Sequence, residues 1–267
     1  MIYPDTMKAK LISTCVLLLL LGISLMGQEK KPMFLYVESG IDFISCEQPD
    51  KDYIRADVEP YYELFATNYI RALMHNNFFG VRFGKRFAKN LLEISGGLRY
   101  TRVITSIGKP AYWSDSPDFF YVNYRTDGIN TDYAKVYELN QRSDYIGIPV
   151  DIRIFPYEER LINVYYKAGA SVNLNVGSKS DVVFFDDAMN PYEKDVADVI
   201  ESPSSFFGSL NLGIGLKVGR PGKAGFNIET AFPIGIFTSG KAGFVNPQAG
   251  GGVQLMVRIP LNKKTGK

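Results

Sequence analysis

The sequence predicts an all-β protein: an eight-stranded antiparallel up-and-down transmembrane β-barrel with long outer loops and short periplasmic turns. Three observations support this prediction. Eight stretches alternate apolar with polar or small residues, as strands do when one face meets lipid and the other a polar lumen. The connectors between these stretches are alternately long and short, and an export signal precedes the first stretch.

The first residues have the features of an export signal. A short basic segment at 7–10 precedes an apolar run at 11–26, and the small Gly27 is followed by a polar segment. This order predicts a signal peptide over residues 1–27 that is removed after export, and we interpret residues 1–6 as an upstream start or an unused extension. The alternative is a membrane anchor, but the run is shorter than the ~20 residues that a spanning helix needs.

Residues 28–267 form the predicted barrel domain. This part of the chain holds one cysteine, Cys46, so we expect no internal disulfide. None of its segments approaches the ~18 consecutive apolar residues of a membrane helix. The net charge of +2 gives no support for a nucleic-acid partner, and 25 glycines with 13% aromatic residues fit tight turns and aromatic girdles.

The strands are predicted from side chains that alternate with a period of two. In the clearest case, 146–154, isoleucine or valine at every second position alternates with Gly147, Pro149, Asp151 and Arg153. We expect the apolar side chains to face lipid and the others to face the lumen. In order, the apolar sets span 35–43, 79–83, 92–100, 146–154, 162–174, 210–218, 226–236 (ending with Ile236) and 253–259.

Two prolines, Pro149 and Pro233, fall inside predicted strands. Proline has no N–H to donate, and a closed barrel has no edge strand where that lack would be harmless. We therefore expect a β-bulge or a strand end at each of them.

The connectors favour a membrane barrel over a soluble one. A lipocalin-like soluble barrel would also have two-faced strands, with the apolar face inside. Its connectors would not be sorted by length to the two ends, whereas outer-membrane barrels place short turns in the periplasm and long loops outside. We therefore expect a Gram-negative outer-membrane protein surrounded by lipid. The short turns are 88–90, 156–160 and 220–224, and the long loops are 46–77, 108–143, 177–205 and 238–248.

Charged residues dominate the predicted lumen. A barrel of eight strands is just wide enough for side chains to fill it, and buried charges persist only when they are paired. We therefore expect a lumen network of ion pairs and hydrogen bonds, with a charged conduit for small solutes as the alternative. Its predicted members are Glu38, Asp42, Arg82, Glu93, Arg99, Asp151, Arg153, Lys167, Lys217, Glu229 and Arg258.

One strand carries a family resemblance. The segment 145–153, Tyr-Ile-Gly-Ile-Pro-Val-Asp-Ile-Arg, resembles the Tyr-x-x-Ile-Pro strand of PorT-like outer-membrane barrel proteins of the Bacteroidetes, and the glycine-rich strand 206–219 and the final strand 249–261 are also similar. The resemblance implies a barrel over residues 28–267. One class of these proteins serves the type IX secretion system, and most have no known function. The sequence departs from the motif at Asp151, where an apolar residue is usual.

Two outer loops have an unusual composition. Loop 108–143 is rich in aromatic residues that could bind a sugar or a partner protein, or could extend the strands and pack on one another. The candidate partner-binding residues are Tyr112, Trp113, Phe119, Phe120, Tyr121 and Tyr124. Loop 177–205 is acidic; calcium is conceivable there, but it lacks EF-hand spacing, so we expect a solvated acidic surface. In loop 46–77, apolar spacing fits a short helix over the barrel mouth or an extension of the second strand.

The sequence gives little support for catalysis. The single histidine, His75, has no recognisable nucleophile near it, and one histidine with one mature cysteine makes a poor metal site. We expect no enzymatic activity, no cofactor and no metal. The favoured function is a structural or accessory component of an envelope assembly or secretion machine. The alternatives are a surface binding protein that uses the aromatic loop, a lipid-modifying barrel enzyme or a small pore.

Overall fold

The computed structural model describes residues 33–47, 54–56, 72–87, 91–108, 119–127, 130–157, 161–220, 223–238 and 245–261. The predicted signal peptide lies outside these residues, as do Tyr112 and Trp113. Within the described ranges, no helix is long and apolar enough to cross a membrane.

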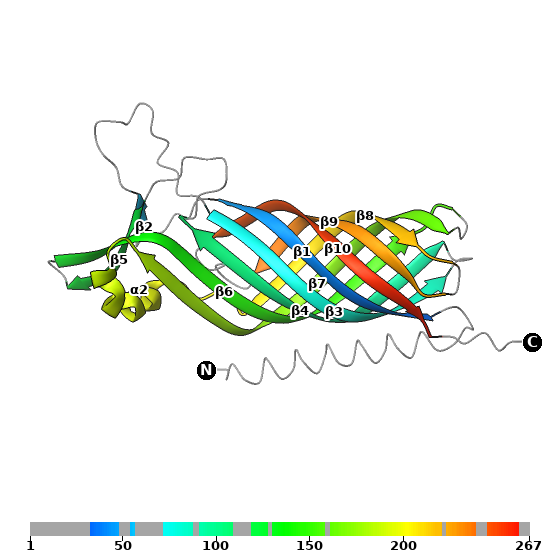
Figure 1. The fold of residues 1–267 in the computed structure, drawn as a ribbon, viewed down its shortest axis with the longest axis horizontal. Helices are drawn as coiled ribbons and strands as arrows, with labels where there is room; N and C mark the ends of the chain where they lie inside the picture. The colour runs from blue at the N-terminus through cyan, green and yellow to red at the C-terminus, as the bar shows by residue number, and fades with distance from the viewer. Residues whose placement is uncertain are drawn as a thin grey trace, which may run out of the picture.

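Eight strands form a closed antiparallel ring, which confirms the predicted fold class (Figure 1). Each strand of the ring pairs with the next along the chain, and the last pairs with the first between Phe34 and Pro260. The ring consists of β1 (Met33–Glu47), β3 (Ala72–Phe87), β4 (Leu92–Ile107), β6 (Asn130–Ile154), β7 (Ile162–Phe184), β8 (Phe206–Val218), β9 (Gly225–Thr238) and β10 (Asn246–Pro260).

Four further elements project beyond one end of the ring. Strand β5 (Phe120–Asp127) pairs with β2 (Ile54–Ala56) and with the outer part of β6. Strand β7 is followed by the 3-10 helix η2 (Asp187–Tyr192) and by α2 (Glu193–Val199). In Figure 1 these elements lie at the left, whereas β1 begins and β10 ends at the right, with the short connections. The topology rule for such barrels places the right end in the periplasm and the left end outside the cell.

Two segments predicted as loops are largely regular structure. In 108–143 the structure has β5 and more than half of the 25-residue strand β6, and in 177–205 it has the end of β7, η2 and α2. The reason is a cluster of buried apolar side chains outside the membrane belt, which includes Phe120, Val136 and Phe184. Directly beyond the membrane belt the outward residues of β6 include Asn140, Arg142 and Asp144, so the strands continue there without the lipid-facing pattern that revealed them elsewhere.

The burial pattern is inverted relative to a soluble protein. Along β6, Val150 is 46% exposed, whereas its neighbour Asp151 is 2% exposed. The same alternation runs through the other strands of the ring, with leucine, isoleucine, valine and phenylalanine outside and charged or small residues inside. A continuous apolar outer face of this size needs an apolar solvent, and the lipocalin-like alternative, with its apolar interior, is wrong.

The two prolines behave differently. At Pro233 the pairing of β9 with β8 shifts register between Leu210 and Asn211, which is the predicted bulge. The bulge reverses the alternation, so Ile236 pairs with lumen-facing Ser209 and lines the lumen; its predicted lipid-facing position is wrong. At Pro149 the register of β6 on β4 is unchanged, and the ladder only lacks the pairs of Gly97 and Leu98.

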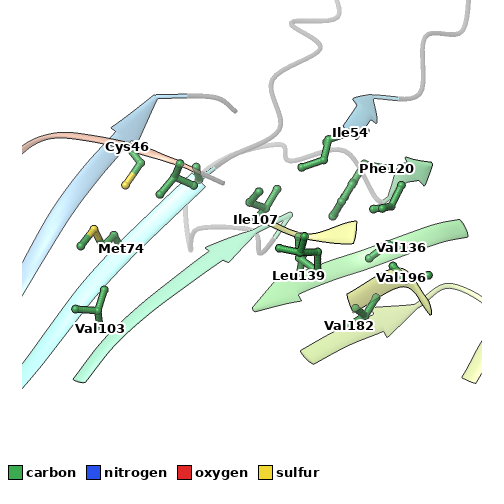
Figure 2. Close-up of a cluster of buried hydrophobic side chains, with 14 of the residues drawn as sticks. Cys46, Ile54, Met74, Val103, Ile107, Phe120, Val136, Leu139, Val182 and Val196 are labelled. Atoms are coloured by element: carbon green, nitrogen blue, oxygen red, sulfur yellow. The ribbon is translucent and has the colours of Figure 1, made fainter. Parts of the chain in front are cut away.

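An apolar cluster lies at the outer mouth of the ring and under the projecting strands (Figure 2). Its side chains come from strands of the ring, such as Met74 on β3 and Val103 on β4, and from the projection, such as Phe120 on β5 and Val196 on α2. Of loop 46–77, residues 46–47 belong to β1, 54–56 to β2 and 72–77 to β3, and the others lie outside the described residues, so the choice between a helix and a strand extension over 57–71 stays a prediction.

Candidate functional site

The lumen of the periplasmic half is filled by an ion-pair network centred on Arg153. The Arg153 guanidinium is fully buried and contacts three carboxylates: Nε lies 2.6 Å from Glu229 Oε1, Nη1 lies 3.1 Å from Glu93 Oε1, and Nη2 lies 3.2 Å from Asp151 Oδ2. Nη1 also donates to Ser95 Oγ at 2.6 Å. Residues of three strands, β4, β6 and β9, converge here because inward residues of a narrow barrel meet at its axis.

The three carboxylates each have further partners. Glu93 accepts hydrogen bonds from the Tyr36 hydroxyl at 2.7 Å and from Arg86 Nε at 3.0 Å. Glu229 accepts from the Tyr165 hydroxyl at 2.6 Å and from Lys167 Nζ at 2.9 Å. Such multiple contacts are what allows a buried carboxylate to stay ionised.

A second group of charges lies around Glu38. Its carboxylate pairs with Arg82 Nε at 2.6 Å and with Arg99 Nε at 2.8 Å, and it accepts a hydrogen bond from Gln254. Arg82 also pairs with Asp151, which links this group to the Arg153 group. The two groups therefore form one continuous polar plug across the lumen.

The periplasmic end of the plug combines cations with aromatic rings. Arg258 lies 4.9 Å from the centre of the Phe34 ring, and Arg86 lies 4.3 Å from that of Phe155. Lys217 lies 5.9 Å from the Phe155 ring, a looser contact. These contacts hold the cations at the end of the barrel where the carboxylates are fewer.

Above the plug lies a small polar cavity. Its volume is about 40 Å³, which is room for a few water molecules. Asp42, Asn76 and Asn211 line it, and the Oδ1 atom of each is buried without a protein hydrogen-bond donor. Water molecules in the cavity can satisfy these oxygens, so the middle of the lumen is hydrated rather than packed.

The segment that follows α2 lies in the outer mouth. Residues 201–205 fold back against the inner wall, where Tyr145 Oη donates to the Ser204 carbonyl at 3.1 Å and Gln141 Nε2 to the Glu201 carbonyl at 2.9 Å. Ser204 and Phe207 are buried at this point. The polar plug therefore fills the lumen below, and this segment narrows the mouth above.

The predicted lumen residues take three positions. Glu38, Arg82, Glu93, Arg99, Asp151, Arg153, Lys167 and Glu229 meet in the plug, Lys217 and Arg258 lie at its periplasmic end, and Asp42 lines the cavity. The alternation also placed Arg86 in the inward charged set, whereas Tyr36, Tyr165 and Gln254 were not named as members of the network. Their inward register on the alternating strands was the available signal, but two of them are aromatic and do not resemble lumen residues by polarity.

The described aromatic residues of the predicted partner-binding loop divide between two faces of the projection. Phe120 is fully buried in the apolar cluster. Tyr124 packs 6.1 Å from the Tyr192 ring, and burial, with the nearby Asp132 carboxylate, raises the pKa of its phenol. Phe119 and Tyr121 lie on the opposite, outward face, where their ring centres are 5.7 Å apart.

The outward face of the projection carries an aromatic patch, which we define as Phe119, Tyr121, Tyr137 and Phe185. The Phe185 ring centre lies 4.8 Å from that of Tyr137 and 5.6 Å from that of Phe119. The Lys135 ammonium lies between Phe119 and Phe185, at 3.6 and 3.7 Å from the ring centres. Tyr137 and Phe185 are both exposed, so the patch is open to a ligand.

The acidic segment lies in β7, η2 and α2, and the histidine lies in β3. Asp186 accepts a hydrogen bond from the Ala188 N–H and caps η2, and Asp181 pairs with Lys179. Among the described residues, no group of three or more acidic, histidine or cysteine side chains could hold a metal ion. His75 lies in β3 rather than in a loop, and its partners across the sheet are Phe43 and Ile104, neither a nucleophile nor a carboxylate.

The closed ring and its inverted burial define the class of the protein. All backbone ladders of the ring are satisfied by neighbouring strands, the outer face is apolar, and the charges are inside. A closed β-barrel is one of the two backbone arrangements that can span a bilayer. The chain is an outer-membrane β-barrel protein whose lipid-facing surface contacts the membrane.

Comparisons with known proteins find solved structures of similar fold, but they assign the chain to no family. No family model and no curated protein sequence matches the chain. The solved structure of Ail, the attachment invasion locus protein of Yersinia pestis, is 9% identical; the match covers 87% of this chain and 100% of that chain, with a TM-score of 0.33. Neisserial surface protein A is 13% identical over 84% of this chain and 96% of that one, with a TM-score of 0.33. OprG from Pseudomonas aeruginosa is 11% identical over 86% and 97%, with a TM-score of 0.38.

Proposed function

We propose that this barrel is a non-enzymatic structural or accessory component of an envelope assembly or secretion machine, of the PorT-like kind that the 145–153 strand resembles. The observation that supports the proposal is the polar plug that fills the lumen, with segment 201–205 narrowing the mouth above it. A barrel filled in this way offers its partners its outer surfaces. One of these is the projection of β2, β5, the outer parts of β6 and β7, and α2 (Figure 1).

The non-enzymatic part of the proposal is tested at His75. A lipid-modifying enzyme of the Ser-His type needs its histidine as the base. In the sheet His75 pairs with Phe43 and Ile104, and its ring lies 6.5 Å from that of Phe43. A His75→Ala strain is expected to keep a wild-type lipid A and phospholipid profile, and an altered profile would favour the enzyme.

The accessory role is tested by co-purification with and without the projection. The pair between Ile107 and Leu139 closes the β4–β6 ladder at its outer end. A short turn that joins Gly108 to Glu138 in place of residues 109–137 therefore removes the hairpin and leaves that ladder intact. From detergent extracts, the full chain is expected to retain a stable envelope protein that the shortened chain loses. Both chains must first show the mobility shift on heating that marks a folded barrel.

A folded full chain that co-migrates with no envelope protein under mild detergent conditions contradicts the accessory role. If the shortened chain retains a partner as well as the full chain does, the docking surface lies on the barrel wall or the periplasmic turns and not on the projection.

A second candidate function is surface binding through the aromatic patch. The exposure of Tyr137 and Phe185 on the outward face favours it, because exposed rings at a protein surface contribute binding area at low entropic cost. Tyr137→Ser with Phe185→Ser is expected to remove such binding while the apolar cluster behind the patch keeps the projection folded. Phe120→Ser serves as the contrasting variant, since it disturbs that cluster.

A further inference from the structure

The lipid-facing belt ends in charged residues on one side of the barrel. On β4 the outward residues are apolar from Leu92 to Leu98, followed by Tyr100 and Arg102, and on β6 they are apolar from Ile154 to Ile146, followed by Asp144 and Arg142. On β7 the apolar face ends at Val176, and Lys179 and Asp181 follow. We call these six residues, Tyr100, Arg102, Asp144, Arg142, Lys179 and Asp181, the polar row.

The register of the sheet makes the polar row continuous. Arg102 lies opposite Asp144, and Arg142 lies opposite Lys179. Followed the other way, the same row reaches Asn77 on β3 and Ile41 on β1, which are uncharged. In this direction the charged residues end at β4, so the polar row lies on the face formed by β4, β6 and β7.

Within the row the cations remain available. Arg102 Nε donates to Asp144 Oδ1 at 2.8 Å, and Tyr100 Oη donates to the same oxygen at 2.6 Å. Arg142 Nε is 4.0 Å from Asp144 Oδ2, and Lys179 pairs with Asp181. The side chains of Arg102, Arg142 and Lys179 are 40%, 49% and 67% exposed. Three cations against two carboxylates leave a net positive charge of one on this surface.

The position of the row determines what it meets. Its side chains point sideways from the barrel wall, directly outward of the acyl-chain belt, so the molecules that cover the belt place their head groups here. Exposed arginines favour phosphate, because the planar guanidinium offers paired donors to two oxygens of one group. A phosphate-bearing lipid of the outer leaflet fits both the location and the charge.

The aromatic patch continues the same face farther from the membrane. Tyr137 lies five residues before Arg142 on β6, about 16 Å along an extended strand, and Phe185 lies six residues after Lys179 on β7. Both side chains are on the outward face. Moving away from the bilayer, the face is thus apolar, then cationic, then aromatic. Exposed aromatic rings provide flat surfaces on which sugar rings can stack.

We propose that the face of β4, β6 and β7 binds a phosphorylated glycolipid of the outer leaflet. Its acyl chains lie on the apolar belt, its phosphates on Arg102, Arg142 and Lys179, and its sugars on Tyr137 and Phe185. This inference goes beyond the accessory role and does not depend on it. The contact of the sugars with Tyr137 and Phe185 rests on the second candidate function, surface binding, and names its class of ligand.

The phosphate contacts are tested with the purified full chain in detergent and bisphosphorylated lipid A as the probe. Arg102→Gln with Arg142→Gln and Lys179→Gln is expected to weaken binding by at least about tenfold, since each cation near a lipid head group contributes to the attraction. The matched control neutralises three exposed cations away from the row, Arg125, Lys194 and Arg220, and is expected to bind as the wild type does. Equal binding by the row variant and the control overturns the proposal.

Further arms separate the sources of phosphate. Dephosphorylated lipid A is expected to bind the wild-type protein no more tightly than it binds the row variant. Inorganic phosphate that saturates the row and competes fully at millimolar concentration would overturn the assignment to a lipid. Arg142→Gln alone keeps the Arg102–Asp144 pair, so it provides a folded variant if the triple change impairs folding.

The sugar contacts have a separate readout. Tyr137→Ser with Phe185→Ser is expected to weaken binding of a lipopolysaccharide that carries core sugars and to leave binding of lipid A unchanged. Unchanged binding of both lipids overturns the sugar contact. Because these assays use the purified barrel, a failed co-purification with envelope proteins leaves their outcome untouched.

Discussion

At the scale of single residues, the lumen depends on Arg153. Its fully buried guanidinium contacts Glu93, Asp151 and Glu229 at once. A buried charge left without its partner costs far more than an exposed one, because the remaining charge cannot be rehydrated. The inside of the barrel is therefore more sensitive to a single substitution than its charged outer surfaces.

Arg153→Met is expected to lower the free energy of unfolding by about 3–5 kcal/mol, as the removal of one partner from a buried pair does. Urea titration of the barrel in phospholipid vesicles, followed by tryptophan fluorescence or by gel mobility, measures this loss. Lys194→Met, which removes an exposed charge from α2, is the control and is expected to change stability by less than about 1 kcal/mol. A loss of that small size for Arg153→Met would show that the network does not support the fold.

Val150 and Asn211 test which face meets lipid. Val150 points outward at the centre of the lipid-facing part of β6, residues 146–154, and Asn211 lines the cavity near the Asp151 carboxylate. Val150→Arg is expected to cost about 2–4 kcal/mol and to reduce insertion, as a cation facing lipid near the bilayer midplane does. Asn211→Arg is expected to insert more efficiently, because water and a carboxylate are within reach. The reverse order in a vesicle insertion assay would place the faces the wrong way round.

At the scale of elements, β9 changes face at its bulge. Before Pro233 the strand presents Phe232 to lipid, Ile234 at the bulge is 62% exposed, and Ile236 lines the lumen. The bulge lets one strand of the closed ring accommodate a residue without an N–H donor. The same device supplies an apolar side chain to the upper lumen, next to the apolar cluster.

Cysteine labelling distinguishes the two faces of β9. In a Cys46→Ser background, Ile234→Cys is expected to react with a membrane-soluble maleimide, and Ile236→Cys is expected to react at least about tenfold more slowly because the barrel wall shields it. Both variants should be reconstituted to the same folded fraction. Comparable labelling at the two positions would mean that the alternation runs through Pro233 without a bulge.

How much could be predicted from sequence differs between elements. The strands that cross the membrane were predictable, because lipid on one side forces apolar residues to every second position, as in 146–154. The outer parts of β6 and β7 were not, because residues such as Asn140 and Arg142 face water there and hide the alternation. Ile236 was misplaced because a bulge shifts the face without changing the pattern before it. The signal peptide and the roles of Tyr112 and Trp113 stay predictions.

The lumen was partly predictable for a related reason. Inward charges stand out in the sequence, so Glu38, Arg153 and Glu229 could be named before the structure. Tyr36 and Tyr165 could not be recognised as partners, because a tyrosine inside a strand resembles a lipid-facing aromatic residue. The narrowing of the mouth by 201–205 was also unpredictable, since it depends on backbone carbonyls that leave no mark in the sequence.

At the scale of the whole molecule, the part that lies in the membrane and the part that carries the candidate binding surface are different regions of the chain. The ring provides a lipid-facing belt and a filled interior, and the projection carries the exposed aromatic patch outside the membrane (Figure 1). The buried ion pairs of the plug give the inside a stabilising role. The surfaces that our proposals assign to other molecules are the wall above the belt, including the polar row, and the projection.

Single-channel recording in a planar lipid bilayer tests the sealed lumen most directly. The mature chain, refolded and shown by protease protection to be inserted, is expected to give no conductance steps above the baseline of the bare membrane. Its plug around Arg153 blocks the path of ions, and the segment 201–205 narrows the mouth above it. Steady, reproducible conductance steps that disappear when the protein is omitted would contradict this account and favour the small pore.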